Sequence, residues 1–361
     1  MTLRIGVDAR ELLGDATGVG RYLGELMRRW TARPDRGARE FLLYSPAPLP
    51  LALPAGSVRG RVVGRGTGTW WEQAALRRAV QADRPDLFFA PAYTAPLGLR
   101  MPLAATIHDI SFVAHPEWFP PRERWRRRLI TARTAAAAAV VLTVSQFSRG
   151  ELERWLAVPA ERIRVIAPGV SSPAAPPPGA AREPLVLYTG SLFNRRRLPD
   201  LIAAFAAATA DLPEARLMIV GADRTWPRQD LAAVAAAHGV AARVELRSYV
   251  ADAELARLYA RAAVFAFLSE YEGFGLTPLE ALGAGVPIVV LDTPVAHEVY
   301  GAAACFVGAG DIAGTAAALR RLLLDPASGA AGLAEAAPLL RRYSWDRAAD
   351  ETLSALEGIA R

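Results

Sequence analysis

The 361-residue sequence contains no lysine, so all 42 of its cationic side chains are arginine. With the heavy use of alanine, this absence is typical of a GC-rich genome. The single cysteine, Cys305, excludes an internal disulfide and indicates a reducing compartment. The longest apolar run, Ala135–Val144, is far short of the ~18 residues that a membrane span needs. No signal-peptide pattern opens the chain, so we expect a soluble, cytoplasmic protein.

Several site patterns are also missing. No Asp-x-Asp pair and no Cys/His cluster has metal-ligand spacing, so we expect no required metal. No Ser-His-acid set is indicated either. A glycine loop follows the first predicted strand, but Gly18-x-Gly20-x-x-x-Gly24 departs from the G-x-G-x-x-G spacing of a dinucleotide site. The second strand also lacks a ribose-binding acid at its end, which argues against NAD.

The composition is that of a folded protein whose charge is unevenly distributed. Apolar residues make up 52% and charged residues 22% of the chain, which excludes a disordered chain. The net charge of +6 is the sum of +10 over residues 1–170 and −4 over residues 171–361. A basic half could serve nucleic acid, an anionic membrane or a phosphorylated substrate.

Strand-like and helix-like patterns alternate along the chain, which predicts an α/β fold with parallel sheets. The predicted strands are Leu3–Asp8, Phe41–Tyr44, Val58–Val63, Asp86–Ala90, Leu103–Ile107, Val140–Val144, Leu185–Thr189, Arg216–Val220, Val244–Arg247, Val264–Phe267 and Pro287–Val290. A proline-rich segment, residues 173–184, interrupts the alternation and is typical of a linker. We therefore predict two doubly wound, Rossmann-like domains, 1–172 and 185–343, with the ligand site in the cleft between them.

The most informative stretch runs from Ser269 to Glu280. Thr277, Pro278 and Glu280 fit a capping box at a helix start, which would give Glu280 a purely structural role. A helix start preceded by two glycines also presents free N–H groups to an anion, and the Glu272 carboxylate could accept hydrogen bonds from sugar hydroxyls. The spacing alone leaves both interpretations open.

In this stretch the sequence resembles a known family. Glu272 and Glu280 match the E-x7-E signature of bacterial, mannosyltransferase-like family 4 (group 1) retaining glycosyltransferases, which have the GT-B fold. Further matching segments follow in the family's order over nearly the whole chain: Gly18-Val19-Gly20-Arg21-Tyr22, His108-Asp109, Tyr188-Thr189-Gly190-Ser191-Leu192, Gly285-Val286-Pro287-Ile288-Val289 and Tyr343-Ser344-Trp345.

The resemblance implies that the C-terminal domain binds a nucleotide-diphosphate sugar and the N-terminal domain an acceptor. Arg195 and Arg196 would neutralise the leaving diphosphate, where fixed cations are most effective. Glu280 would bind the ribose, and Glu272 the donor sugar. The remaining donor-binding positions are Gly18, Gly20, Gly190, Phe274, Gly275 and Leu276. The C-terminal helix, 344–361, would pack back on the first domain.

His108 follows the predicted strand Leu103–Ile107, and the family places a histidine there beside the transferred sugar. The chain also departs from the family pattern. Arg196 and Arg197 stand where the family usually has Lys and Asn, Leu268 replaces a proline, and Glu270 replaces an apolar residue. The second carboxylate, two residues from Glu272, leaves the role of each acid open. Arg197 is expected to be solvated.

The run from Arg122 to Arg128 contains Trp125 and five arginines. It fits either a solvated helix face or a patch that touches anionic lipid at the inner face of the plasma membrane. No nucleic-acid-binding fold accompanies it.

We predict transfer of a hexose, from GDP-mannose or a UDP-hexose, to a sugar or lipid-linked acceptor by front-face attack, in envelope polysaccharide or glycolipid synthesis. The alternatives are a GT-B sugar epimerase, a sugar-phosphate synthase and a non-catalytic, arginine-rich anion-binding protein.

Overall fold

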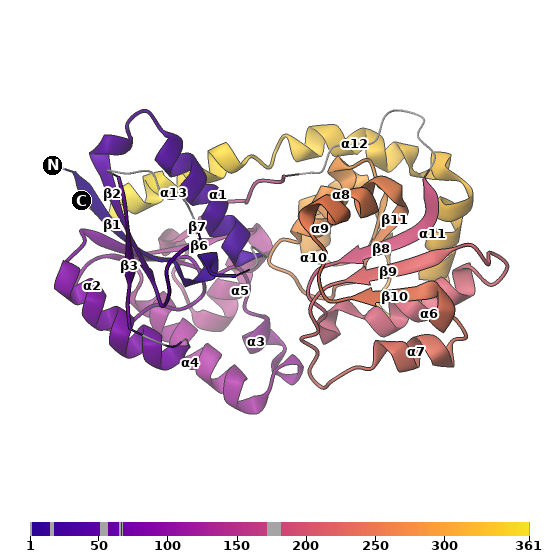
Figure 1. The fold of residues 1–361 in the computed structure, drawn as a ribbon, viewed down its shortest axis with the longest axis horizontal. Coiled ribbons are helices and arrows are strands. Elements are labelled where there is room, and N and C mark those ends of the chain that lie inside the picture. Colours follow the sequence, from indigo (N-terminus) through magenta and orange to yellow (C-terminus); the bar gives the residue numbers. More distant parts are fainter. Residues whose placement is uncertain are drawn as a thin grey trace. The chain divides into compact units, whose positions relative to one another are not determined.

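A computed structural model describes residues 2–14, 18–50, 57–64, 66, 68–171 and 182–360. It divides the chain into two compact units (Figure 1). Unit 1 comprises residues 1–114, 121–169 and 343–361, and unit 2 comprises residues 115–120 and 170–342. Most of the predicted linker, residues 173–181, lies outside the described residues, and Glu183 and Pro184 already belong to the first strand of unit 2.

Unit 1 is built on a seven-stranded parallel sheet with the strand order β3-β2-β1-β4-β5-β6-β7. Its strands are β1 (Leu3–Asp8), β2 (Arg39–Ser45), β3 (Val58–Val62), β4 (Leu87–Ala90), β5 (Leu103–Thr106), β6 (Val140–Thr143) and β7 (Ile163–Val165). Helices connect them: α1 (Val19–Ala32), α2 (Arg77–Asp83), α3 (Ser111–Ala114), α4 (Pro121–Ala137) and α5 (Gln146–Leu156), with short turns η1 (Arg10–Leu12), η2 (Arg36–Ala38) and η5 (Ala160–Arg162). The short turn η4 (Pro116–Trp118), between α3 and α4, belongs to unit 2.

Residues 71–83 form a helix in two parts. Its first part is a π-helix, η3 (Trp71–Leu76), and only the second is the α-helix α2. Glu72 is 2% exposed in η3, so the wider turn places a carboxylate in the interior. A hydrophobic pattern with an α-helical period cannot distinguish these two kinds of helix.

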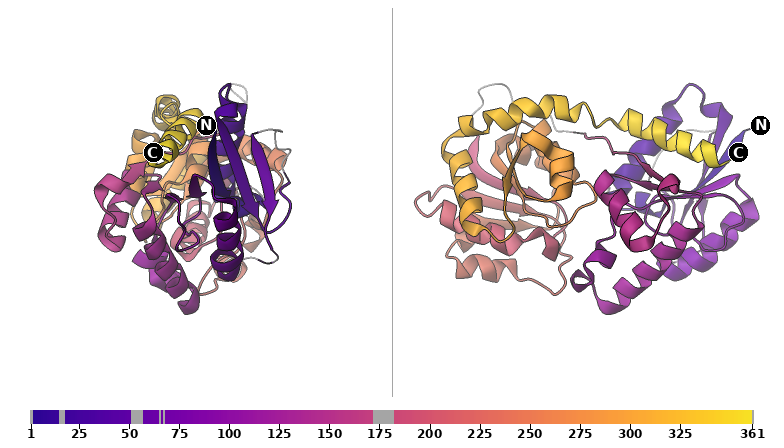
Figure 2. Two further views of the ribbon diagram at one scale, coloured as in Figure 1. Left: turned by 90° about the vertical axis from the view of Figure 1, so that its left-hand side faces the viewer. Right: turned by 180° about the vertical axis from the view of Figure 1, so that it is seen from behind.

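The last helix of the chain, α13 (Trp345–Ile359), belongs to unit 1. Both views of Figure 2 show this yellow helix beside the indigo first part of the chain, and α13 contacts α1. The α1 residues Leu23, Leu26 and Trp30 share a buried apolar cluster with Leu353 and Leu356. The Trp30 indole donates a hydrogen bond to the backbone carbonyl of Ala349 at 2.8 Å.

Unit 2 is built on a six-stranded parallel sheet with the strand order β10-β9-β8-β11-β12-β13. Its strands are β8 (Glu183–Thr189), β9 (Arg216–Val220), β10 (Val244–Arg247), β11 (Ala262–Phe267), β12 (Ile288–Leu291) and β13 (Ala304–Val307). The helices are α6 (Leu198–Ala208), α7 (Leu231–Ala237), α8 (Asp252–Arg261), α9 (Leu276–Gly283), α10 (Pro294–Tyr300), α11 (Ile312–Leu324) and α12 (Ala330–Leu340), with turns η6 (Asn194–Arg196), η7 (Ala241–Arg243), η8 (Gly301–Ala303) and η9 (Pro326–Gly329).

The predicted α/β class with two doubly wound parallel sheets is confirmed. Strand order reverses between β1 and β4 in unit 1 and between β8 and β11 in unit 2. Ligands of such sheets bind beyond the carboxyl ends of the strands at these switch points. The sequence prediction missed β7 and β13, which have three and four residues. None of the helices in the described ranges has the length and hydropathy that crossing a bilayer requires.

Arginine side chains bind the carbonyl ends of helices in unit 2. The Arg182 guanidinium donates hydrogen bonds to carbonyls of Tyr259, Ala260 and Ala262 at the end of α8. It also donates to Ala284 and Gly285, just beyond α9, at 2.7 and 3.0 Å. The last carbonyls of a helix have no partner within it and carry its partial negative charge. One guanidinium thus donates hydrogen bonds to carbonyls at the ends of two helices, α8 and α9, beside the start of β8.

Candidate functional site

Two loops of unit 2 bring the predicted donor residues together. The arginine turn, Phe193–Arg197, follows β8, and the acid loop, Ser269–Gly275, follows β11. Because β8 and β11 are neighbours at the switch point, the two loops meet at the carboxyl edge of the sheet. The N–H of Glu270 donates to the carbonyl of Arg195 at 2.8 Å, and the Arg195 Nε donates to the carbonyl of Tyr271 at 2.9 Å.

Arg196 is held from three sides. Its Nε lies 3.0 Å from Glu272 Oε1, its Nη1 donates to the Tyr188 hydroxyl at 3.1 Å, and its Cζ lies 4.6 Å from the centre of the Phe267 ring. Burial by itself would lower the pKa of the guanidinium, but Glu272 and Tyr188 outweigh burial and raise that pKa. The group is therefore a permanent cation with a fixed position.

Arg195 and Glu272 complete the charged centre of the site. The Arg195 side chain is buried, with its Nε 3.6 Å from Glu272 Oε1 and its Cζ 4.3 Å from the centre of the Phe193 ring. The Ser269 hydroxyl donates to Glu272 Oε1 at 2.7 Å. One carboxylate thus faces two arginines, an arrangement in which an incoming diphosphate would meet preorganised cations.

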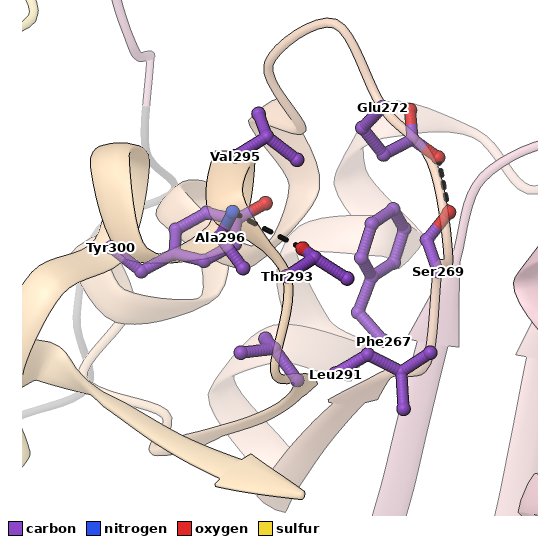
Figure 3. A pocket seen from close by; sticks show the side chains of 9 residues that line it. Phe267, Ser269, Glu272, Leu291, Thr293, Val295, Ala296 and Tyr300 are labelled. Carbon is purple, nitrogen blue, oxygen red and sulfur yellow. Dashed lines mark hydrogen bonds between the residues drawn. The ribbon is translucent and has the colours of Figure 1, made fainter. Parts of the chain in front are cut away.

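A pocket opens beside Glu272 within unit 2 (Figure 3). Figure 3 shows Phe267, Ser269 and Glu272 on one side and residues of α10 and the loop before it on the other. Its lining is mostly apolar with a few hydroxyl and carboxylate groups, as in many small-molecule sites: Phe267, Ser269, Glu272, Val290, Leu291, Thr293, Val295, Ala296 and Tyr300.

The capping box predicted at Thr277, Pro278 and Glu280 is wrong. Helix α9 begins at Leu276, and its N-cap is Gly275 with φ +89°, without a side-chain cap. A glycine in this left-handed region reverses the chain without a Cβ clash, so the helix starts before Thr277 can cap it. The Thr277 Oγ1 is buried without a hydrogen-bond partner. The first N–H groups of α9 have no acceptor within the helix, as the predicted anion site requires.

Because the capping box is absent, Glu280 lies in the second turn of α9 and does not close the helix start. Glu280 is 4% exposed and accepts a hydrogen bond from the Tyr259 hydroxyl at 3.3 Å. The Tyr259 oxygen is also 2.9 Å from the Thr189 hydroxyl at the end of β8. The sequence prediction missed Tyr259 because it belongs to α8 and reaches Glu280 only through tertiary packing.

Gly190 follows β8 with φ +129°, and a Cβ there would lie 2.5 Å from Arg196 Nη1. Any side chain would displace the guanidinium. Gly190 therefore contributes to the site by leaving room for the Arg196 guanidinium.

The other predicted residues belong to unit 1. His108 lies just after β5, with its Nε2 2.9 Å from the carbonyl of Pro91. Burial lowers the pKa of this imidazole, against the opposing effects of that carbonyl and Asp109. The ring is therefore neutral near pH 7, with the proton on Nε2. Tyr22 and Tyr93 pack edge-on against it at 4.9 and 5.6 Å between ring centres.

Gly18 and Gly20 start α1. Gly18 is its N-cap with φ +52°, and Gly20 packs in the first turn against the carbonyl of Glu11. Residues 15–17, which precede them, lie outside the described residues.

Sequence reasoning missed a buried ionic cluster at the carboxyl end of β1. Arg10 Nη2 lies 2.8 Å from Asp8 Oδ2 and also pairs with Glu72. Thr94 donates to Glu72 at 2.6 Å. Burial raises the pKa of Asp8 to about 6, with Arg10 opposing that shift and Glu72 adding to it. The strand prediction placed Asp8 at the end of a strand, but nothing in the sequence indicated that Arg10 would pair with both Asp8 and Glu72.

Within the part of the chain that the structure describes, no group of three His, Cys, Asp or Glu side chains could hold a metal ion.

Known proteins resemble this chain along both units. Residues 183–325 match the family described as "Glycosyl transferases group 1", and residues 16–172 match "Glycosyltransferase Family 4". The O-antigen chain mannosyltransferase B of Escherichia coli is 27% identical over an alignment that covers 94% of this chain and 95% of that protein.

Two solved structures share the fold. The sucrose-phosphate synthase of Thermosynechococcus elongatus superposes with a TM-score of 0.81 at 19% identity, covering 99% of this chain and 98% of that one. The Anabaena HepE protein, in complex with UDP and glucose, gives a TM-score of 0.76 at 20% identity, covering 99% and 100%.

Proposed function

We propose, from the premise that this chain belongs to the family 4 (group 1) glycosyltransferases, that it moves a hexose from a nucleotide-diphosphate sugar to a hydroxyl of an envelope saccharide. The family expected from the sequence motifs is thereby confirmed. The cluster of Arg195, Arg196 and Glu272 at the switch point of unit 2 carries the proposal, because it offers two fixed cations to a leaving diphosphate.

The donor that we propose is GDP-mannose, with UDP-hexoses as the alternative. Support comes from the E. coli relative, which is named as a mannosyltransferase of the O-antigen chain; the Anabaena structure holds UDP and glucose. The acceptor on this proposal is a growing saccharide, free or lipid-linked.

The proposed chemistry is a front-face displacement that retains the anomeric configuration and needs no metal. The bond from the anomeric carbon to the phosphate oxygen breaks as the acceptor oxygen attacks from the same face, and the acceptor proton passes to the departing phosphate. Arg195 and Arg196 stabilise the charge that develops on the diphosphate. Glu280 binds the ribose and Glu272 the sugar. Neutral His108 orients the acceptor, because its Nδ1 can accept a hydrogen bond from the acceptor hydroxyl.

Donor binding tests this proposal. GDP-mannose should raise the unfolding temperature of the purified protein, by an amount that corresponds to about 2.7 kcal/mol at a hundredfold excess over Kd. Glu280→Gln should weaken donor binding by about 10- to 100-fold, because it removes charged hydrogen bonds to the ribose. The control is Glu335→Gln, an exposed position on α12. The measurement is thermal unfolding with a panel of GDP- and UDP-sugars.

Turnover then distinguishes the alternatives. A transferase releases nucleotide only with a saccharide acceptor, an epimerase converts the donor alone, and a synthase requires a phosphorylated sugar. An anion-binding protein shows a thermal shift without turnover. If no nucleotide sugar binds at millimolar concentration, the proposed function is wrong.

We also propose that one face of α4 contacts an anionic membrane. Arg122, Trp125, Arg126 and Leu129 follow the i, i+3, i+4, i+7 spacing of one helix face. Trp125 and Leu129 are 66% and 50% exposed. Arg126 hydrogen-bonds to Thr69, beside Trp70, which is 72% exposed. The basic-aromatic patch combines interfacial apolar side chains with positive charge and consists of Trp70, Arg122, Trp125, Arg126 and Leu129.

Arg122→Gln/Arg126→Gln should weaken binding to phosphatidylglycerol vesicles by roughly 30-fold, since each cation near such a surface contributes about 1 kcal/mol. Trp70→Ala/Trp125→Ala should also weaken it. The measurement is vesicle co-sedimentation, with phosphatidylcholine vesicles as the uncharged comparison. Trp155→Ala, an exposed tryptophan of α5, is the matched control. Equal sedimentation of all variants would contradict membrane contact. The remaining interpretation would be a solvated helix face.

A further inference from the structure

Two residues that depart from the family pattern, Arg197 and Glu270, contact each other in the structure. An Arg197 Nη atom pairs with Glu270 Oε1. Arg197 also binds Asp200, with its Nε donating to Oδ2 at 2.6 Å. The sequence predicted that Arg197 would be solvated. In the structure its guanidinium instead binds two carboxylates. The charge of Glu270 in the acid loop is thus neutralised by Arg197 in the arginine turn.

The backbone at Arg197 makes this pairing informative. Its φ is +47°, in the left-handed region, where asparagine is favoured over other side chains that carry a Cβ. Arginine at this position is less favourable for the backbone than the family's usual asparagine. The side chain compensates through contacts that asparagine is too short to make.

Backbone hydrogen bonds and ion pairs join the arginine turn to the acid loop along their length. The Glu270 N–H binds the Arg195 carbonyl, and the Arg195 Nε binds the Tyr271 carbonyl. Arg196 faces Glu272, and the Arg197–Glu270 ion pair closes the outer end. The side chains of Arg197 and Glu270 are 27% and 29% exposed, compared with 11% and 12% for Arg196 and Glu272. The outer pair is thus accessible to water, and the inner one is shielded.

We propose that Arg197 and Glu270 are positioning residues, whose ion pair holds the arginine turn against the acid loop and keeps the Glu270 charge away from Arg195 and Arg196. Without Arg197, the Glu270 carboxylate would compete with Glu272 for these cations and repel the donor diphosphate. This inference rests on the proposed donor site and adds two residues to it that do not touch the donor.

Arg197→Asn, Glu270→Gln and the double variant test the pair. Arg197→Asn is compatible with the backbone, so misfolding is not expected. It should lower kcat/KM for the donor by about tenfold, mainly through KM, and less at high salt because the uncompensated carboxylate is then screened. Glu270→Gln should lower kcat/KM by about threefold. The double variant should resemble Glu270→Gln, because residues that form one unit are not additive.

The matched control is Glu183→Gln, which breaks the exposed Arg261–Glu183 pair of the same unit. It should leave kcat/KM and its salt dependence unchanged. A double variant no better than Arg197→Asn, or a single variant indistinguishable from the control, would overturn the positioning role. Failure of the wild-type protein to bind or turn over any nucleotide sugar would instead refute the proposed function, so the two failures are distinguishable.

Discussion

Arg196→Met is expected to reduce sugar transfer by about 100- to 1000-fold, the usual effect of removing one preorganised group from a developing anion. Methionine retains much of the packing on Phe267 but removes the charge that faces Glu272. The loss should fall mainly on kcat, since the negative charge of the diphosphate grows as the bond to the sugar breaks. The measurement is single-turnover release of nucleotide at saturating donor.

Arg196→Lys should recover most of the lost rate. The ammonium group keeps the charge, as the family's usual lysine does, but it cannot contact Glu272 and the Tyr188 hydroxyl with the planar geometry of a guanidinium. Thermal unfolding of each variant shows whether unit 2 remains folded. If Arg196→Met transfers sugar within about threefold of the wild-type rate, Arg196 does not stabilise the leaving group.

Deletion of residues 343–361 is expected to prevent unit 1 from folding. Trp345, Leu353 and Leu356 are at most 3% exposed, and burying each contributes about 1.5–3 kcal/mol. Their sum is comparable to the whole stability of a typical domain, about 5–15 kcal/mol. The truncated chain would also leave the Trp30 indole without the Ala349 carbonyl. Soluble yield and near-ultraviolet circular dichroism measure the outcome.

Single substitutions on α13 separate burial from charge. Leu356→Ala should cost about 2–5 kcal/mol of stability, as buried leucines typically do. Asp346→Asn removes an ion pair with Arg29 in which the aspartate is 82% exposed, and such pairs contribute about 0–1 kcal/mol. A truncated protein that unfolds at the wild-type temperature would show that α13 adds nothing to the core of unit 1.

The strands of unit 2 illustrate what could be predicted from the sequence. β9 and β10 match the predicted residues because β9 is an apolar run after Arg216 and β10 alternates apolar and charged residues. β13 is a four-residue strand in an alanine-rich region, which has no contrast in hydropathy to reveal it. The predicted strands nevertheless placed the arginine turn and the acid loop at strand ends. This was enough to predict that Arg196 and Glu272 lie at the same edge of the sheet.

The details of the site depended on information that spacing does not contain. A capping box and a glycine-capped helix start fit the same letters, and the left-handed conformation of Gly275 decides between them. The sequence could not assign partners to two acids beside three arginines, because a shift of one side chain exchanges the pairs. Tyr259 and Tyr300 reach the site from other helices, at distances in sequence that no local pattern covers.

The position of α13 in the chain also determines when unit 1 can be completed. Residue 169 of unit 1 and residue 345 lie against each other, yet nearly all of unit 2 is synthesised between them. At roughly 5–20 residues per second, the ribosome needs on the order of ten to thirty seconds for that stretch. During this interval the apolar face of α1 has no α13 to cover it, and unit 2 has its full sequence once residue 342 has been added. The unit that begins the chain is therefore the last to have its full sequence, because it needs residues 343–361.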